Sequence, residues 1–248
     1  MVEKISVTIL TKNSQKYLKE SLNALKPFDE VIILDNGSTD STLEIASSFD
    51  NVKIVEHEFI GFGPMKNLAA EFAKNDWIFS VDSDEIVSKE LIDSIKMLNP
   101  KNIGHLYSVS RLNHYRKKAI KCCGWYPDVV TRLYNKNSAR FSDAMVHESI
   151  VAGANKVVKL SGYLKHYPFD DIDLMISKIQ KYSTLFSEQT NRRSSPLKAF
   201  SRATFAFFKS YFLKKGFLCG YEGILISVYN STTVFFKYMK LYEKHKYD

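Results

Sequence analysis

Along the first third of the chain, the spacing of apolar residues alternates between a pattern typical of strands and a pattern typical of helices. The run ISVTIL, beginning at Ile5, is typical of a strand, and over residues 14–25 the apolar positions recur at helical spacing. The run EVIILD, which ends at Asp35, is almost continuously apolar and predicts an interior strand of a parallel sheet, covered on both faces. Two further strands are expected in VKIVEH and in DWIFSVD, the second ending at Asp82.

Helical segments separate these strands. Ser41 and Glu44 have the spacing of a capping box and predict a helix start, and another helix is expected over residues 64–74. Strands and helices that alternate in this order predict an α/β fold with a doubly wound, mostly parallel sheet. In such sheets ligands bind beyond the carboxyl ends of the strands, so the residues that follow each strand are the first candidates for a site.

The pattern changes in the second half of the chain. The runs HLYSVSRLN and VVTRLYN predict two strands on either side of a turn at residues 124–127, and helical spacing dominates after Asp170. We therefore predict two parts, a body over residues 1–169 and a helical appendage over residues 170–248. Within the appendage an amphipathic basic helix is expected, with one face formed by Phe200, Thr204, Phe207, Phe208 and Tyr211.

The charge is concentrated in this appendage. Residues 1–177 carry 22 Lys and Arg against 23 Asp and Glu, a formal charge of −1, whereas residues 178–248 carry 13 against 4, a charge of +9. The second segment also contains 16 of the 33 aromatic residues. A nearly neutral body with a basic, aromatic tail favours an anionic membrane surface as a partner over nucleic acid. The stretch over residues 216–236 is too polar to predict a membrane-spanning helix.

Other features of the sequence favour a cytoplasmic protein. Three cysteines, two of them adjacent at Cys122 and Cys123 and the third at Cys219, have the pattern of neither a disulfide framework nor a zinc motif, so a reducing compartment is expected. The apolar run at the N-terminus is too short for a secretory signal. We predict a cytoplasmic protein that is peripheral on the inner face of the bacterial cytoplasmic membrane.

Polar residues follow three of the predicted strands. Thr11 and Asn13 come after the first, Asp35 after the second, and Asp82 and Asp84 after the fourth. Because the carboxyl ends of parallel strands meet at one edge of a sheet, these side chains are expected to converge on one crevice. The glycine-rich motifs of dinucleotide enzymes and P-loop ATPases are absent, which argues against both classes.

Asp82 and Asp84 form a D-x-D motif that can direct carboxylate oxygens at one hard divalent cation. Mg²⁺ or Mn²⁺ held in this way keeps several waters and is completed by substrate phosphates. Such acidic pairs also occur where they only cap a helix or solvate a turn, but the position of this pair in the crevice favours the metal. Asp35 can bind a nucleobase or ribose, or form an Asx turn. Lys66 and Asn67 can bind a diphosphate, or lie on a solvated helix face.

Several of these motifs together resemble the family 2 glycosyltransferases. TKN at Thr11, DNGSTD at Asp35, GFGPMKN at Gly61 and VDSDE at Val81 match that family in order and spacing. More narrowly, GWYPD, RLY, VHE and YFLKKGFLCGYEG resemble the subfamily that adds glucose or a related sugar to the lipopolysaccharide inner core. The resemblance covers nearly the full chain, and the absence of Q-x-x-R-W favours transfer of one sugar per acceptor.

The resemblance implies an A-type glycosyltransferase fold, with a Rossmann-like nucleotide-sugar domain, and a metal bound by the D-x-D motif. It also implies inversion at the anomeric carbon in a single displacement. The expected donor is a UDP-sugar, and the expected acceptor is a lipid-linked saccharide, with lipopolysaccharide core first. The residues expected to contact the donor are Thr11, Asn13, Asp35, Lys66, Asn67 and Asp82.

The reaction requires a base that removes the proton of the acceptor hydroxyl. The family usually places its base in a Glu-Asp pair after the D-x-D motif, and Glu148 occupies the comparable place here, with Ser149 instead of the aspartate. We predict Glu148 as the base and keep Asp128 as the second candidate, ahead of Asp143. Two histidines have a possible function. His147 can act as an orienting group and His166 as a further metal or phosphate ligand, and for each the alternative is a structural role.

Two alternative interpretations stay open at this point. The acceptor can instead be a polyprenyl phosphate, a capsule glycan or a glycoprotein glycan. The chain can also be a catalytically inactive membrane adaptor that retains a nucleotide pocket for stability. Nucleotide binding without hydrolysis or transfer of any donor would favour the adaptor.

Overall fold

The structure of the chain, a computed structural model, describes residues 2–98, 102–145, 148–151 and 156–247. The chain divides into two compact units. Unit one comprises Met1–Arg111 and Asp128–His166, and unit two comprises Leu112–Pro127 and Tyr167–Asp248.

Unit one is built around one large sheet. Its strands, together with a separate two-stranded pair, are β1 (Val2–Thr11), β2 (Phe28–Asp35), β3 (Val52–Glu56), β4 (Trp77–Asp82), β5 (Glu85–Val87), β6 (His105–Tyr115), β8 (Asp128–Asn135), β9 (Arg140–Phe141), β10 (Ile150–Val151) and β11 (Lys156–Phe169). The order β3-β2-β1-β4 is parallel, which confirms the predicted parallel strands. The order continues through β8, β6, β11 and β5 with antiparallel pairing of β4 with β8, β8 with β6, and β11 with β5, so the whole sheet is mixed.

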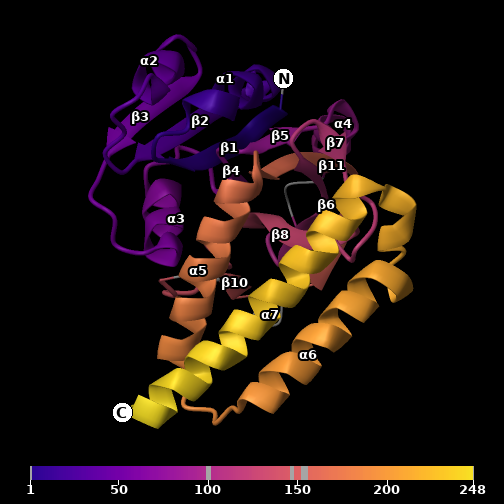
Figure 1. Cartoon of the computed structure of the whole chain (residues 1–248). Helices are drawn as coiled ribbons and strands as arrows, with labels where there is room; N and C mark the ends of the chain where they lie inside the picture. The colour runs from indigo at the N-terminus through magenta and orange to yellow at the C-terminus, as the bar shows by residue number, and fades with distance from the viewer. Residues whose placement is uncertain (1, 99–101, 146–147, 152–155, 248) are drawn as a thin grey trace. The chain divides into compact units, whose positions relative to one another are not determined.

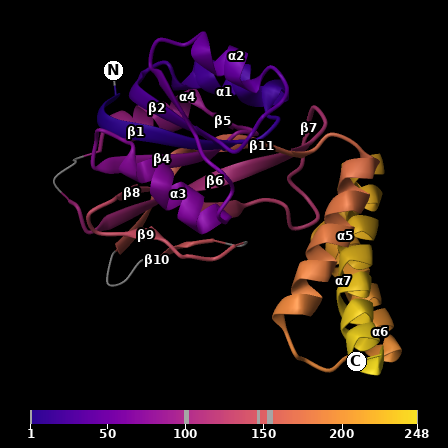
Figure 2. The same ribbon diagram turned by 90° about the vertical axis from the view of Figure 1, so that its left-hand side faces the viewer.

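Helices cover both faces of the parallel strands (Figure 1). They are α1 (Gln15–Leu25), α2 (Thr42–Ser47), α3 (Phe62–Glu71) and α4 (Lys89–Lys96). Successive residues of β2 point to opposite faces: Ile33 shares a core with Leu22 of α1, whereas Leu34 packs with Met65 of α3. α1 and α3 accordingly lie on opposite sides of the sheet (Figure 2), and the predicted strand with two covered faces is confirmed.

The helix start predicted near Ser41 is confirmed, but the capping box is wrong. Ser41 makes no side-chain hydrogen bond at the start of α2. Asp40 Oδ1 instead accepts hydrogen bonds from the backbone nitrogen of Thr42 at 3.0 Å and from its Oγ1 at 2.5 Å. Asp40 therefore closes the turn just ahead of α2.

Unit two is mainly helical. Its elements are β7 (Lys118–Ala119), α5 (Ile172–Gln189), α6 (Pro196–Phe208), the π-helical turn η1 (Lys209–Leu213), the 3₁₀ turn η2 (Gly216–Cys219) and α7 (Tyr221–Tyr247). α6 and α7 run side by side (Figure 1). The segment 112–127, which the predicted division placed in the body, packs here because Ile120 shares a core with Phe169 and Ile226. None of the helices in the described ranges is long and apolar enough to cross a membrane.

Cys122 and Cys219 form a disulfide bond, and Cys123 is a buried free thiol. The prediction that the cysteines form no disulfide is therefore wrong. The two bonded residues are 97 positions apart, and the packing of unit two, which spacing does not reveal, brings them together. The cysteine pattern consequently gives no support to a reducing compartment.

Candidate functional site

The carboxyl ends of β1, β2 and β4 lie together at one edge of the unit-one sheet. In the parallel register Thr11 is opposite Asp35, and Leu10 is opposite Asp82. The predicted convergence of three strand ends on one place is confirmed. Because these strands are parallel neighbours, their ends present the side chains of Thr11, Asp35 and Asp82 at the same edge.

Asp35 is fully buried and accepts four hydrogen bonds at the end of β2. Thr11 Oγ1 donates to it at 2.7 Å, Ser38 donates through Oγ at 2.5 Å and through its backbone nitrogen at 2.7 Å, and Gly37 N donates at 2.9 Å. Burial alone would raise the pKa of Asp35, but these hydrogen bonds outweigh burial and lower it. The carboxylate therefore stays ionised and closes a turn. Contact with a donor stays a prediction for Asp35 and for Thr11.

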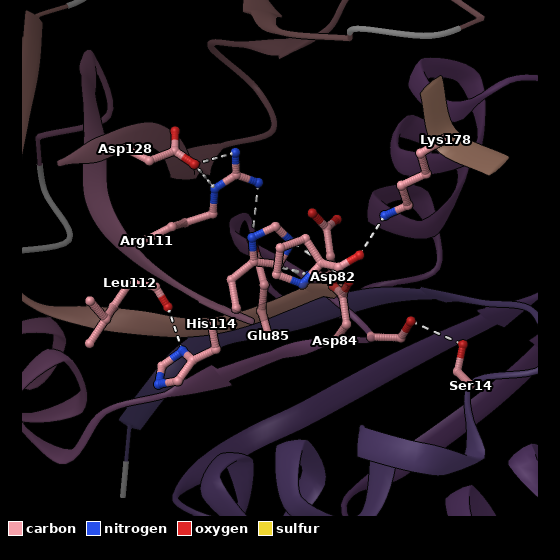
Figure 3. Close-up of polar contacts among 12 residues, drawn as sticks. Ser14, Asp82, Asp84, Glu85, Arg111, Leu112, His114, Asp128 and Lys178 are labelled. Carbon is pink, nitrogen blue, oxygen red and sulfur yellow. Dashed lines mark hydrogen bonds and ion pairs between the residues drawn. The ribbon is translucent and has the colours of Figure 1, made fainter. Parts of the chain in front are cut away.

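Asn13 connects the loops that follow β1 and β2. Its Oδ1 accepts a hydrogen bond from Thr39 N at 2.8 Å, and its backbone nitrogen donates to Ser38 Oγ at 2.8 Å. Ser14 Oγ donates to Ser83 Oγ at 3.0 Å, which joins the loop after β1 to the D-x-D segment (Figure 3). Asn13 thus fixes the shape of the edge, and its predicted contact with the donor stays a prediction.

Asp82 is held between two cations. Lys66 Nζ lies 3.0 Å from Oδ1, and an Arg132 guanidinium nitrogen contacts Oδ2. The backbone nitrogen of Asp82 also donates to Glu85 Oε2 at 3.0 Å. Burial opposes ionisation of Asp82, but the positive charges of Arg132 and Lys66 outweigh it and hold its pKa far below the ordinary value. Burial likewise works against the charge on Arg132, and the two carboxylates raise its pKa.

A line of ion pairs continues from Asp82 to Asp128. Arg132 Nη2 lies 2.6 Å from Oε1 of Glu85, a fully buried carboxylate, and Arg111 Nη1 lies 3.5 Å from the same oxygen. Arg111 also holds Asp128 Oδ2, through Nε at 2.9 Å and Nη2 at 2.8 Å. Figure 3 shows the Arg111 guanidinium facing Asp128, with Asp82, Asp84 and Glu85 grouped nearby. Asp128 is thereby connected to the D-x-D motif.

Lys66 connects the other candidate base to the same motif. Its Nζ lies 2.9 Å from Glu148 Oε1 as well as 3.0 Å from Asp82 Oδ1. Only 3% of Lys66 is exposed, so the alternative in which it lies on a solvated helix face is wrong. Lys66 therefore joins Asp82 and Glu148 at this edge of the sheet.

The GFGP segment at the start of α3 explains how Glu148 reaches Lys66. Gly63 N donates to the carbonyl oxygen of Ala144 at 3.1 Å, and a Cβ at Gly63 would lie 1.8 Å from the carbonyl oxygen of Ser142. Only glycine permits this approach of the 142–145 segment to the helix that carries Lys66. Asn67 supports the same contact from α3.

Both polar atoms of the Asn67 amide are engaged with Phe141. Asn67 Nδ2 donates to the carbonyl oxygen of Phe141 at 3.0 Å, and Asn67 Oδ1 accepts from its backbone nitrogen at 2.8 Å. This pairing fixes β9 against α3. That Asn67 contacts the donor stays a prediction. Its two hydrogen bonds to Phe141 also position β9.

Asp84 and His166 form the pair that best fits a divalent metal. Asp84 Oδ2 lies 3.6 Å from His166 Nε2, and both side chains are partly exposed. The β5–β11 register places His166 opposite Glu85, next to the D-x-D motif. A carboxylate and an imidazole suit Mn²⁺, and Mg²⁺ or Mn²⁺ would complete its shell with waters and phosphate oxygens. Lys66 and Arg132 contact the two carboxylate oxygens of Asp82. Direct coordination of the metal by Asp82 therefore stays a prediction.

The metal would depend on substrate for part of its shell. Over the described ranges, no group of three or more His, Cys, Asp or Glu side chains is placed to hold a metal ion. Two protein ligands with phosphate oxygens and waters are the usual arrangement for Mg²⁺ at phosphate-transferring sites. Of the other predicted residues, the base candidate Asp143 is exposed and pairs with Arg140 at 3.1 Å, and His147, predicted as an orienting group, lies outside the described residues.

Sequence reasoning missed Arg132 and Arg111 as parts of the site and gave Glu85 no role in it. Arg132 stands in the otherwise strand-like run VVTRLYN, and Glu85 directly follows the D-x-D motif. A charge inside a buried strand requires a partner of opposite sign, which is the one signal that could have identified Arg132.

Removal of the Arg132 guanidinium should destabilise unit one strongly. Arg132→Leu would leave Asp82 and the fully buried Glu85 without their shared counter-charge, and breaking a buried pair in this way costs about 3–5 kcal/mol. We expect the free energy of unfolding, measured by urea denaturation, to fall by that amount. Arg140→Leu is the matched control, because the Arg140–Asp143 pair is exposed and should contribute little. Equal losses in the two variants would contradict this account.

This chain is similar to several known proteins. Residues 6–118 match the family model described as Glycosyl transferase family 2. An uncharacterized glycosyltransferase of Rickettsia bellii is 30% identical over 259 residues, covering 98% of this chain and 87% of that protein. The lipopolysaccharide core biosynthesis glycosyltransferase LpsC of Rhizobium meliloti is 26% identical over 254 residues, covering 97% of this chain and 93% of that protein. The crystal structure of S. aureus TarS 1-349 in complex with UDP-GlcNAc is similar with a TM-score of 0.48 and 18% identity, covering 98% of this chain and 91% of that one.

Proposed function

Because this chain belongs to glycosyl transferase family 2, we propose that it moves a single hexose, with inversion, from a nucleotide diphosphate donor to a lipid-linked saccharide. The chain has the A-type glycosyltransferase fold, with the site at the carboxyl ends of its parallel strands. We expect a UDP-sugar as donor and lipopolysaccharide core as acceptor. The similarity to LpsC, whose name assigns it to core biosynthesis, supports this acceptor over 97% of the chain.

One feature of the site carries the proposed reaction. A buried lysine and a carboxylate–imidazole pair are grouped at the strand edge, with Lys66 on Asp82 and Asp84 beside His166. Fixed positive charge at such an edge stabilises the negative charge that develops on a departing nucleotide diphosphate. Asp84 and His166 would hold the divalent metal, and a bound metal would neutralise part of that charge.

Glu148 is the base that we propose for the acceptor hydroxyl. Lys66 fixes one oxygen of its carboxylate at 2.9 Å, and the side chain is 17% exposed, which leaves it reachable by a substrate. When Glu148 takes the proton of the hydroxyl, it loses its negative charge, and Lys66 then has only Asp82 as an acidic partner among the ion pairs described above. The ammonium would therefore act more strongly on the diphosphate as the sugar leaves. Asp128, whose Oδ2 is held by Arg111, stays the second candidate.

The acceptor also determines where the reaction takes place. A saccharide that carries lipid lies at a membrane, and residues 178–248 carry a formal charge of +9 that anionic headgroups would attract. We propose that the protein is peripheral on the inner face of the cytoplasmic membrane, where nucleotide sugars are available.

A donor screen tests the proposal. The purified chain, with Mn²⁺ or Mg²⁺, should release nucleotide from one of a panel of UDP-, GDP- and CDP-hexoses, with UDP-hexose expected. Lipopolysaccharide core should accelerate this release more than polyprenyl phosphate, capsule or glycoprotein glycans do. Nucleotide binding without release from any donor, with or without acceptors, would instead support the inactive adaptor.

A further inference from the structure

α6 packs beside α7, and its buried residues, Ala199 and Ala203, are both small. Across the pair, Ser231 Oγ donates a hydrogen bond to the carbonyl oxygen of Ala203 at 2.8 Å. Small residues on α6 allow the two helices to approach closely at this contact.

Large apolar residues of α6 and of the neighbouring turn η2 are exposed. Phe200 and Phe205 of α6 are 66% and 59% exposed, and Leu218 of η2 is 68% exposed. Helices of water-soluble proteins bury their large apolar side chains and expose polar ones. Small residues at a helix contact, as on α6, are common where helices pack in lipid.

Exposed and partly exposed aromatic rings form a continuous cluster where α6 meets α7, over residues 208–221, which we name the α6–α7 corner. The rings of Phe208 and Phe212 have their centroids 5.1 Å apart. Tyr211 continues the cluster, with centroid distances of 5.1 Å to Phe212 and 6.4 Å to Phe217. Leu213 is exposed in the same turn. A contiguous apolar patch of this kind marks an interaction surface.

The charge around this patch has one sign. No acidic residue occurs between Glu188 and Glu222, and the basic residues of that interval are Arg192, Arg193, Lys198, Arg202, Lys209, Lys214 and Lys215. A pocket of about 410 Å³ opens between α6, η1 and α7, and Lys209, Lys214, Ser210 and Asn230 are among the residues that line it. Ser210 and Asn230 are hydrogen-bonded to each other and to the carbonyl oxygen of Cys123, so the two lysines are the groups of this pocket that suit the phosphate of an anionic lipid.

We propose that the α6–α7 corner is a docking surface for an anionic lipid bilayer, with its phenylalanine and leucine side chains at the acyl boundary and Lys209 and Lys214 on lipid phosphates. No helix of the described residues can cross a bilayer, so the helix pair would lie in the interface. The inference deepens the proposed function by naming the surface that brings the enzyme to a lipid-linked acceptor. It depends on that function only for the acceptor, because binding to lipid requires no sugar transfer.

Vesicle co-sedimentation of the full chain tests the proposal. We expect binding to vesicles of phosphatidylcholine mixed with phosphatidylglycerol, weakened by salt, and little binding to phosphatidylcholine alone. Phe212→Ser and Leu218→Ser should each lower the affinity on the order of tenfold, since each removes a large apolar group from lipid. Lys209→Ala and Lys214→Ala should each lower it about fivefold.

Matched controls lie on α5, outside the corner. Ile176→Ser replaces an apolar side chain that is 56% exposed, and Lys181→Ala replaces an exposed lysine, so neither should change the affinity. Circular dichroism melting checks that each variant is folded. Because Lys209 and Lys214 are exposed, their variants still test the proposal if an apolar variant unfolds. Equal losses in corner and control variants would overturn the proposal.

Three other results would also overturn it. They are absence of vesicle binding by the wild-type chain, equal binding to both kinds of vesicle, and self-association through the corner without lipid binding, which would assign the surface to a second copy of this chain. Donor turnover without vesicle binding would refute only this inference. Vesicle binding without turnover of any donor would refute only the proposed function.

Discussion

Asp84→Ala should abolish sugar transfer, with kcat lowered on the order of 10³-fold or more, while the protein stays folded. The carboxylate of Asp84 lies 3.6 Å from His166. Lys66 and Arg132 contact Asp82, the other aspartate of the D-x-D motif. Its side chain is about one-third exposed, so its removal leaves no buried charge behind. Transfer of labelled sugar at saturating donor, together with thermal melting, measures both parts of this prediction.

The control for this variant is Asp93→Ala. Asp93 is a partly exposed aspartate on α4 that pairs with Lys96 at 3.4 Å, and its loss should leave transfer unchanged. A chelator should abolish wild-type activity, and Mn²⁺ should restore it to the wild type without restoring it to Asp84→Ala. Full activity of Asp84→Ala, or wild-type activity that a chelator does not change, would refute the metal assignment.

Glu148→Gln should lower kcat by about 10²–10⁴-fold and leave the affinity for the donor nearly intact, because a base acts on the acceptor hydroxyl in the transition state. The substitution keeps the shape of the side chain and removes one of two carboxylates on Lys66, which retains Asp82. Calorimetry of donor binding and kcat measured at saturating donor and acceptor separate these effects.

Asp128→Asn is the matched comparison for the base. It also exchanges a carboxylate for an amide at a residue tied to the D-x-D motif, here through Arg111. We expect a much smaller loss of kcat in this variant. If Asp128→Asn shows the large loss and Glu148→Gln does not, the base is Asp128.

The part of the site that could be predicted from sequence depends on local pattern. The run EVIILD reveals a doubly covered parallel strand, and the polar residues after it and after DWIFSVD mark the edge where Asp35 and Asp82 meet in the structure. The carboxyl ends of neighbouring parallel strands lie at the same edge of a sheet. This inference therefore needs no knowledge of side-chain packing.

The ion-pair line could not be predicted in the same way. Arg132 reaches Asp82 and Glu85 because β8 pairs antiparallel with β4, with Leu133 opposite Phe79, and neither that pairing nor its register follows from periodicity. The disulfide between Cys122 and Cys219 likewise depends on the packing of unit two. These contacts are long-range, so they are properties of the folded topology rather than of any local segment.

Helical periodicity was informative about α6 only in part. It grouped Phe200 and Phe208 on one face, and both are exposed in the structure. It did not identify Ala199 and Ala203 as the face that packs against α7, because alanine gives a weak signal in a hydrophobic pattern. Close approach of the two helices, which requires small side chains, decides which face is inside.

Transfer of a labelled hexose from UDP-hexose to purified lipopolysaccharide core tests the central claim most directly. With Mn²⁺ present, the account predicts that the label appears on the acceptor as a single sugar, and that the anomeric configuration of the product, determined by NMR, is inverted relative to the donor. No label on any lipid-linked acceptor despite nucleotide binding, or a product that retains the donor's configuration, would contradict it.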